Sequence, residues 1–334
     1  MKTLLQPSRT STSLLATTAP LPTPTHPDDV LVRVHATSPC AGELRWAIDY
    51  PAAIPADKLL VPCQDLAGTV VTASGKFHPG DRVYCRVSAA RAGAARDYAL
   101  PRASELARIP PSLGWVEAAA TPLSALTAWQ ALFVQGTLDA AGIEDGGSDD
   151  ARARNGQVRV LVAGAGGGVG SWLVQLAALA GAGAVVAVCG PDKADAVRAL
   201  GATEVVDYRK TTIKDWVAGD GDARECGLVV DVIGGETLAG CWAAVRDGGA
   251  LVSITAAPDA LRPEGVVKTL ERSLFFIVEP LGSNLEEIGE LVEAGRVRPT
   301  VDSVWEFDEY EKAFERLDSG HAKGKVVIKV SGEA

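Results

Sequence analysis

The sequence predicts an α/β protein in which a domain of short β-strands accompanies a doubly wound parallel sheet. Residues 158–181 pass from an apolar, β-branched run through a glycine cluster to apolar residues at helical spacing, the pattern of strand, tight turn and helix. Strand-like and helix-like stretches then alternate regularly as far as residue 254. By contrast, the first hundred or so residues contain short strand-like runs separated by Pro, Gly and Asp.

The first part of the chain is expected to form the β-rich domain. After a stiff, proline-rich connector at residues 20–27, strands are predicted at residues 30–36, 66–72 and 81–87. Residues 116–133 carry apolar side chains three and four positions apart, with an interruption at a proline. They predict a helical segment at the crossing to the second domain.

The parallel sheet is expected to follow a flexible, solvated insertion without chemistry of its own, which we predict at residues 139–157 from its Gly, Asp, Ala and Arg content. Further strands are predicted at residues 184–189, 204–206, 228–232 and 250–254, with helices between them.

The carboxyl-terminal part is less regular. It predicts a strand at residues 274–278, a helix at 285–293 and a closing strand at 325–330 that returns to the first domain. The predicted domains are therefore residues 1–125 with 280–334, and residues 126–279.

Composition limits the classes of partner and location. The net charge is −10 and no long basic run is present, so neither nucleic acid nor an anionic membrane is an expected partner. No apolar run is long enough to span a membrane, and the amino terminus lacks the apolar core of a signal peptide. The six cysteines are scattered without a C-x-x-C pair, which favours a reducing compartment, and we expect a cytoplasmic protein.

The glycine cluster is a candidate phosphate cradle. Its pattern, Ala165-x-Gly167-x-x-Gly170, differs from the dinucleotide-binding fingerprint only in its first position. Glycines let a backbone approach a pyrophosphate closely, and the N–H groups at a helix start favour negative charge. A simple tight connection between strand and helix is the alternative interpretation.

The end of the next strand indicates which dinucleotide would bind. An NAD site usually has a carboxylate there, whereas this strand ends in Cys189 and Gly190. Lys193 follows at a helix start, and Arg209 and Lys210 follow the third strand, so a 2′-phosphate would be attracted. This favours NADPH over NADH, although Lys193 could equally be a solvated lysine beside Asp192.

Several segments in the same order resemble the medium-chain dehydrogenase/reductase superfamily, in its zinc-independent quinone oxidoreductase and enoyl reductase branch. The matching segments are residues 29–36, 61–70, 79–83, 126–129, 164–170, 201–208, 230–234 and 324–328. The resemblance implies a GroES-like β domain, a Rossmann domain, and hydride transfer from NADPH across a cleft between them.

The resemblance also implies the cofactor contacts. Gly166, Gly167, Gly168 and Val169 would lie beneath the pyrophosphate, next to Gly170 of the fingerprint. Lys193 and Tyr208 would contact the 2′-phosphate, Lys325 would lie near the cofactor phosphates, and Thr127 would approach the nicotinamide. The family often has a serine before its lysine where this chain has Gly190 and Pro191, so one hydroxyl contact is missing.

The same resemblance bears on metal. Zinc alcohol dehydrogenases of the superfamily read Gly-His-Glu where this chain reads Cys63-Gln64-Asp65, and glutamine lacks the imidazole that a catalytic zinc needs. We therefore expect no metal. Asp65 could act in catalysis, but we favour a structural role in which it accepts backbone N–H bonds at its turn.

Without a metal, a proton donor must meet the charge that forms after hydride transfer. Tyr50 is the candidate, because related enoyl reductases carry a tyrosine before a proline at this place and a phenol is neutral at pH 7. Alternatively, the Tyr50 ring packs at a loop corner. Glu43, Arg45 and Trp46 lie in the same segment and could recognise an aromatic or acidic substrate.

These observations predict an NADPH-dependent reductase of a small molecule with an activated C=C bond, or of a quinone. The alternative is an NADPH-binding sensor or partner protein without rapid turnover. A third interpretation is a tailoring enzyme that acts on a biosynthetic intermediate. Dimers are common in the superfamily, and we expect a homodimer formed through the edge strand near residues 274–278.

Overall fold

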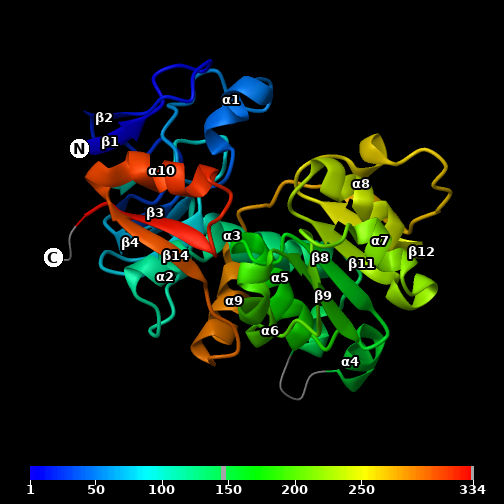
Figure 1. Ribbon diagram of the computed structural model, residues 1–334. Coiled ribbons are helices and arrows are strands. Elements are labelled where there is room, and N and C mark those ends of the chain that lie inside the picture. Colours follow the sequence, from blue (N-terminus) through cyan, green and yellow to red (C-terminus); the bar gives the residue numbers. More distant parts are fainter. Residues whose placement is uncertain (144–147, 332–334) are drawn as a thin grey trace. The chain divides into compact units, whose positions relative to one another are not determined.

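The computed structural model describes residues 1–143 and 148–331, which form two compact units. Unit 1 combines Met1–Leu126 with Glu279–Ala334, so it contains both ends of the chain, and unit 2 is Thr127–Val278. Figure 1 shows unit 1 in blue to cyan and orange to red, and unit 2 in green to yellow.

Unit 1 is built on a mixed, mainly antiparallel sheet. Its order within the described residues is β14-β15-β3-β4-β5-β7, and the short β6 also pairs with β3. The strands are β3 (Val32–Ser38), β4 (Asp65–Val70), β5 (Arg82–Arg86), β6 (Tyr98–Ala99), β7 (Ala107–Arg108), β14 (Val301–Glu306) and β15 (Lys325–Lys329). Because β15 pairs with β3, the end of the chain completes the sheet that its beginning starts. A separate hairpin that we did not predict joins β1 (Lys2–Leu5) to β2 (Leu15–Thr18).

The helices attached to unit 1 are short except for two near the carboxyl end. They are α1 (Trp46–Asp49), α2 (Trp115–Ala119), α3 (Pro122–Trp129), α9 (Gly282–Glu293) and α10 (Tyr310–Asp318). The helical segment predicted at residues 116–133 is divided into α2, α3 and a π-helical turn at Gln130–Val134. Pro122 begins α3, where a missing backbone N–H costs no helical hydrogen bond.

Unit 2 is a doubly wound parallel sheet, which confirms the predicted fold class. Within the described residues its order is β10-β9-β8-β11-β12-β13, and all neighbouring strands are parallel. The strands are β8 (Arg159–Ala163), β9 (Ala184–Cys189), β10 (Glu204–Asp207), β11 (Cys226–Asp231), β12 (Val245–Ser253) and β13 (Arg272–Phe275). The order reverses at β8, and ligands of such sheets bind beyond the carboxyl ends of the strands at this point.

Helices cover this sheet and bury its apolar strands. They are α5 (Gly168–Leu179), α6 (Ala194–Ala199), α7 (Ile213–Ala218) and α8 (Gly235–Ala244). Trp216 of α7 and Trp242 of α8 belong to one buried cluster with Leu161, Val229 and Leu251 of the sheet. In the part of the chain that the structure describes, no helix has the length and apolar character required to cross a membrane.

Two predictions about unit 2 need correction. We expected a solvated loop over residues 139–157, but Asp149–Asn155 form helix α4, which Ser148 caps by accepting the Ala151 N–H at 3.1 Å. The buried Asn155 amide donates to Asp139 O at 2.9 Å and Ala180 O at 2.8 Å and thereby anchors the helix. Residues 144–147 lie outside the described residues. The strand predicted at 274–278 begins earlier, as β13.

Candidate functional site

The turn between β8 and α5 forms an open end of a helix in unit 2. Gly164 has φ +89°, which favours glycine, and the N–H groups of Gly164 and Ala165 both donate to Val188 O at 3.1 Å. The first helical hydrogen bond runs from Ser171 N to Gly167 O at 3.0 Å. The N–H groups of residues 168–170 precede it and face out of the helix end, where they can bind an anion.

Three glycines of this turn differ in the space around them. A Cβ at Gly170 would lie 2.6 Å from Ala165 Cα and still closer to Gly164 O, so glycine is needed for the helix to approach the strand. A Cβ at Gly166 would lie 2.9 Å from Lys193 Cβ, which shows that the Lys193 side chain lies against the turn. Among the described residues, a Cβ at Gly167 would meet only Gly164 O, at 3.6 Å, so the space in front of this residue can admit a ligand.

The predicted 2′-phosphate residues gather at the carboxyl ends of β9 and β10. A Cβ at Gly190 would lie 3.5 Å from both Tyr208 Oη and an Arg209 guanidinium nitrogen. Lys193 N donates to Gly190 O at 3.0 Å, and the Arg209 guanidinium lies 5.8 Å from the centre of the Tyr208 ring. The structure therefore brings Lys193 and Tyr208 together with Arg209 around Gly190. Asp192, 3.7 Å from Arg209, offsets part of this positive charge.

A buried carboxylate that sequence reasoning missed fixes the neighbouring loops. Asp231 ends β11 and accepts hydrogen bonds from Gly234 N (3.0 Å), Ser253 Oγ (2.9 Å) and Thr255 Oγ1 (2.9 Å). These bonds join the loops after β11 and β12. Both loops lie at the carboxyl ends of the strands, as the glycine turn after β8 does. An aspartate that ends an apolar strand before two glycines was the available signal.

In unit 1, a buried ion pair joins β4 to β15. Lys325 Nζ lies 2.9 Å from Asp65 Oδ2 and donates to Pro39 O at 3.0 Å. Asp65 Oδ1 accepts the Leu123 N–H at 2.6 Å, at the start of α3. Burial lowers the pKa of Lys325, but the charge and hydrogen bond of Asp65, together with the nearby Cys40 and Glu43, outweigh it, so this pKa lies above its ordinary value.

This ion pair bears on the roles that we predicted for Asp65 and Lys325. Asp65 is structural, as we favoured, but it binds a distant helix start rather than its own turn. Lys325 is buried and has a carboxylate partner within unit 1, so its charge is balanced without a cofactor, and its contact with cofactor phosphates stays a prediction.

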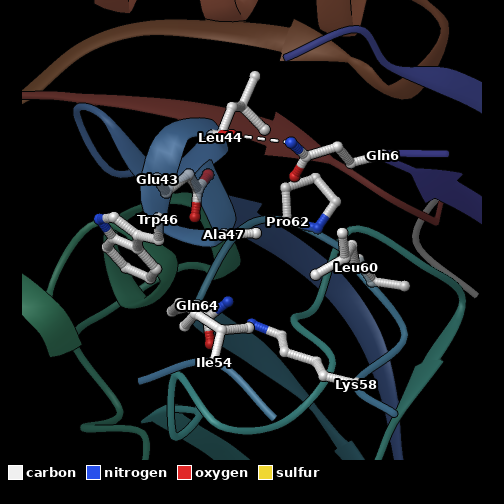
Figure 2. Close-up of a pocket in the computed structure, with 11 residues that line it drawn as sticks. Gln6, Glu43, Leu44, Trp46, Ala47, Ile54, Lys58, Leu60, Pro62 and Gln64 are labelled. Atoms are coloured by element: carbon white, nitrogen blue, oxygen red, sulfur yellow. Dashed lines mark hydrogen bonds between the residues drawn. The ribbon is translucent and has the colours of Figure 1, made fainter. Parts of the chain in front are cut away.

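A second buried carboxylate, Glu43, lies beside the same strand. Both of its oxygens accept the Cys63 N–H, at 3.2 and 3.1 Å, and burial raises the pKa of Glu43 to about 7. Figure 2 shows Glu43, Lys58 and Gln64 among the residues that line a small cavity, and Gln6, which follows β1, donates to Leu44 O at 2.8 Å beside it. The cavity measures about 20 Å³, room for one water molecule rather than a substrate.

The remaining predicted residues occupy different environments. Tyr50 follows α1 and is 56% exposed, so more than half of this residue is open to solvent. Thr127 is buried on α3. Across residues 1–143 and 148–331, no three His, Cys, Asp or Glu side chains form a cluster that could hold a metal ion.

Two family models match the chain. One, described as Alcohol dehydrogenase GroES-like domain, covers residues 26–111, and the other, described as Zinc-binding dehydrogenase, covers residues 200–328.

Individual relatives extend over nearly the whole chain. It is 43% identical over 323 residues to a probable mitochondrial zinc-binding oxidoreductase of Arthroderma benhamiae, an alignment that covers 96% of this chain and 94% of the relative. It is 31% identical to the chloroplast envelope quinone oxidoreductase homolog of Arabidopsis thaliana, over 92% of each chain. The quinone oxidoreductase of Thermus thermophilus, solved also with NADPH, is 25% identical, with a TM-score of 0.75 over 98% of this chain and 100% of that chain.

Proposed function

Because this chain belongs to the quinone oxidoreductase branch of the medium-chain dehydrogenase/reductase superfamily, we propose that it is a zinc-independent, NADPH-dependent reductase. Its substrate is a quinone or a small molecule with a C=C bond conjugated to a carbonyl group, including an intermediate of a biosynthetic pathway. The observation that carries the proposal is the open start of α5 next to Gly167, with Lys193 against the same turn.

In this proposal each group of residues has a separate task. The N–H groups at the start of α5 bind the pyrophosphate, and Lys193, Tyr208 and Arg209 bind the 2′-phosphate. NADPH, when bound, supplies the hydride. Tyr50 then donates a hydrogen bond or a proton to the oxygen that becomes negative in the substrate.

The first experiment is a screen in which enones and quinones are incubated with NADPH, and the loss of NADPH absorbance measures turnover. We expect oxidation of NADPH that depends on at least one acceptor and metal analysis without stoichiometric zinc. Tight NADPH binding with no turnover on any acceptor would instead favour the sensor function, and stoichiometric zinc would contradict the metal-free mechanism.

Lys193→Met is expected to weaken NADPH binding about tenfold to a hundredfold and to leave NADH binding unchanged. The reason is that one charge-assisted hydrogen bond to the 2′-phosphate is worth about 1.5–3 kcal/mol. Fluorescence titrations with both cofactors measure this. Lys312→Met is the matched control, since Lys312 is an exposed lysine on α10 of unit 1, 2.9 Å from Glu309. An equal loss for NADPH and NADH would contradict the assignment of Lys193.

Tyr50→Phe is expected to lower kcat about a hundredfold, the low end of the range for general acid catalysis, because water can reach this exposed position. The affinity for NADPH should not change, because the glycine turn lies in unit 2. Tyr310→Phe, on α10 of unit 1, serves as the control. Unchanged turnover of Tyr50→Phe would remove Tyr50 from the mechanism.

Two further parts of the proposal concern the protein as a whole. Strand β13 lies at an edge of the sheet of unit 2, and we propose that a second copy pairs with it to form a homodimer. The six cysteines all lie in the described part of the chain and form no disulfide there, which fits a reducing compartment such as the cytoplasm.

A further inference from the structure

Cys63 has an unusual backbone. Its φ is +66°, and within residues 1–143 and 148–331 it is the one residue other than glycine with a positive φ. A side chain in this region is strained because its Cβ approaches the following carbonyl oxygen, so such a conformation persists only where its surroundings enforce it. The strained residue is fully buried and comes two positions before Asp65.

Hydrogen bonds hold Cys63 from both sides. Its N–H is directed between the two carboxylate oxygens of Glu43, at 3.2 and 3.1 Å, and its carbonyl accepts the Ala94 N–H at 2.6 Å. The Glu43 side chain is itself buried, and its backbone N–H donates to Cys40 O at 3.2 Å. Because burial raises the pKa of Glu43 to about 7, the side chain is a carboxylate above that pH, and its charge then makes the bond to the Cys63 amide stronger than a neutral acceptor would.

Glu43 also begins the segment that leads to Tyr50. It opens the short helix Glu43–Arg45, which continues directly into α1, and Tyr50 N closes α1 by donating to Trp46 O at 2.9 Å. The Glu43 carboxylate is therefore a direct tie between this segment and the turn that enters β4. Asp65, two residues after Cys63, forms the buried ion pair with Lys325.

We propose that Glu43 is a positioning residue: its carboxylate holds the left-handed backbone of Cys63 and so fixes the segment that carries Tyr50 against the start of β4. The effect on turnover rests on the proposed function, whereas the effect on folding does not. Glycine adopts a positive φ without strain and keeps the same backbone N–H, so in Cys63→Gly the turn should keep its shape, and with it the Tyr50 segment, even when the bond to Glu43 is weakened.

The test is a double-mutant cycle of Glu43→Gln and Cys63→Gly, measured by urea unfolding and by turnover at about pH 8.5, well above the Glu43 pKa of about 7. Glutamine offers the Cys63 N–H one amide oxygen in place of two carboxylate oxygens and carries no charge, so Glu43→Gln should reduce the folding equilibrium constant about tenfold, as expected for a weakened charge-assisted bond. It should also lower kcat, while the KM for NADPH stays constant. In the Cys63→Gly background the same change should lower kcat less than about twofold, whereas its cost in unfolding should remain, because the backbone N–H at position 63 loses the same acceptor.

Glu105→Gln is the matched control. Glu105 is also buried, accepts Arg102 N at 3.0 Å and pairs with Arg91, so its partners differ from those of Glu43. Its cost should be the same in the unchanged protein and in the Cys63→Gly background.

The outcomes decide the proposal in every case. An equal loss of kcat in both backgrounds would overturn it. If no acceptor is ever reduced, amide hydrogen exchange of residues 43–50 decides it instead, and the failure of the proposed function is seen separately. Glu43→Gln should speed this exchange and Cys63→Gly should reverse the change, whereas the same exchange in all variants would overturn the proposal. If Glu43→Gln alone does not fold, recovery of folding by Cys63→Gly supports the proposal, and no recovery overturns it.

Discussion

Asp65→Asn is expected to destabilise unit 1 by about 3–5 kcal/mol, the cost of leaving a buried charge without its partner. The asparagine of this variant can still accept the Leu123 N–H, so the change removes only the negative charge beside Lys325. Arg86 lies opposite Asp65 on β5 and is also buried, so two cations would lose their carboxylate. Urea unfolding followed by tryptophan fluorescence measures the free energy.

Two comparisons make this prediction specific to burial. Asp49→Asn removes the exposed ion pair with Arg45, which is 2.7 Å long, and should leave the urea midpoint nearly unchanged, because exposed ion pairs contribute little to stability. The double variant Asp65→Leu with Lys325→Met removes both charges and should be more stable than Asp65→Asn. If Asp65→Asn unfolds at the same urea concentration as the unchanged protein, the Asp65–Lys325 pair does not contribute to the free energy of unfolding as its burial predicts.

Much of unit 2 could be predicted because its signals are local. An apolar strand, a glycine turn and an apolar helix follow one another within residues 158–181, and the alternation that continues from there specifies a parallel sheet. The glycine turn and Lys193 could be identified for the same reason. Helix α4 was missed because its composition resembles a loop, whereas its stability comes from the Ser148 cap and from the buried amide of Asn155.

The site in unit 1 could be predicted only in part, because its contacts join distant parts of the chain. Asp65 and Lys325 lie far apart in the sequence, and the residues around each give no signal that the two side chains form an ion pair. The Glu43 contact depends on a positive φ at Cys63, and a cysteine in a sequence gives no signal of this backbone conformation. Resemblance to a family supplied positions such as Tyr50 and Thr127, but not the buried network that supports them.

Gly170→Val is expected to weaken NADPH binding on the order of a thousandfold, equivalent to about 4 kcal/mol. The first atom of any side chain at this position would lie 2.6 Å from Ala165 Cα, so α5 would have to move away from the strand. The N–H groups at its start would then lose their direction toward the pyrophosphate, and two charge-assisted hydrogen bonds account for a loss of this size. Fluorescence titration with NADPH measures it.

A variant at the neighbouring Gly167 tells whether NADPH binding falls because the turn is distorted or because the binding space is blocked. Because a Cβ at Gly167 would lie 3.6 Å from Gly164 O, an ordinary contact distance, Gly167→Ala should leave the urea midpoint unchanged. If the pyrophosphate lies over this residue, the added methyl group occupies its space and binding falls although the fold is intact. Gly240→Ala on α8, where a Cβ would lie 3.7 Å from Ile213 Cβ, should alter neither property. Normal NADPH affinity in both Gly167→Ala and Gly170→Val would show that the start of α5 does not hold the cofactor.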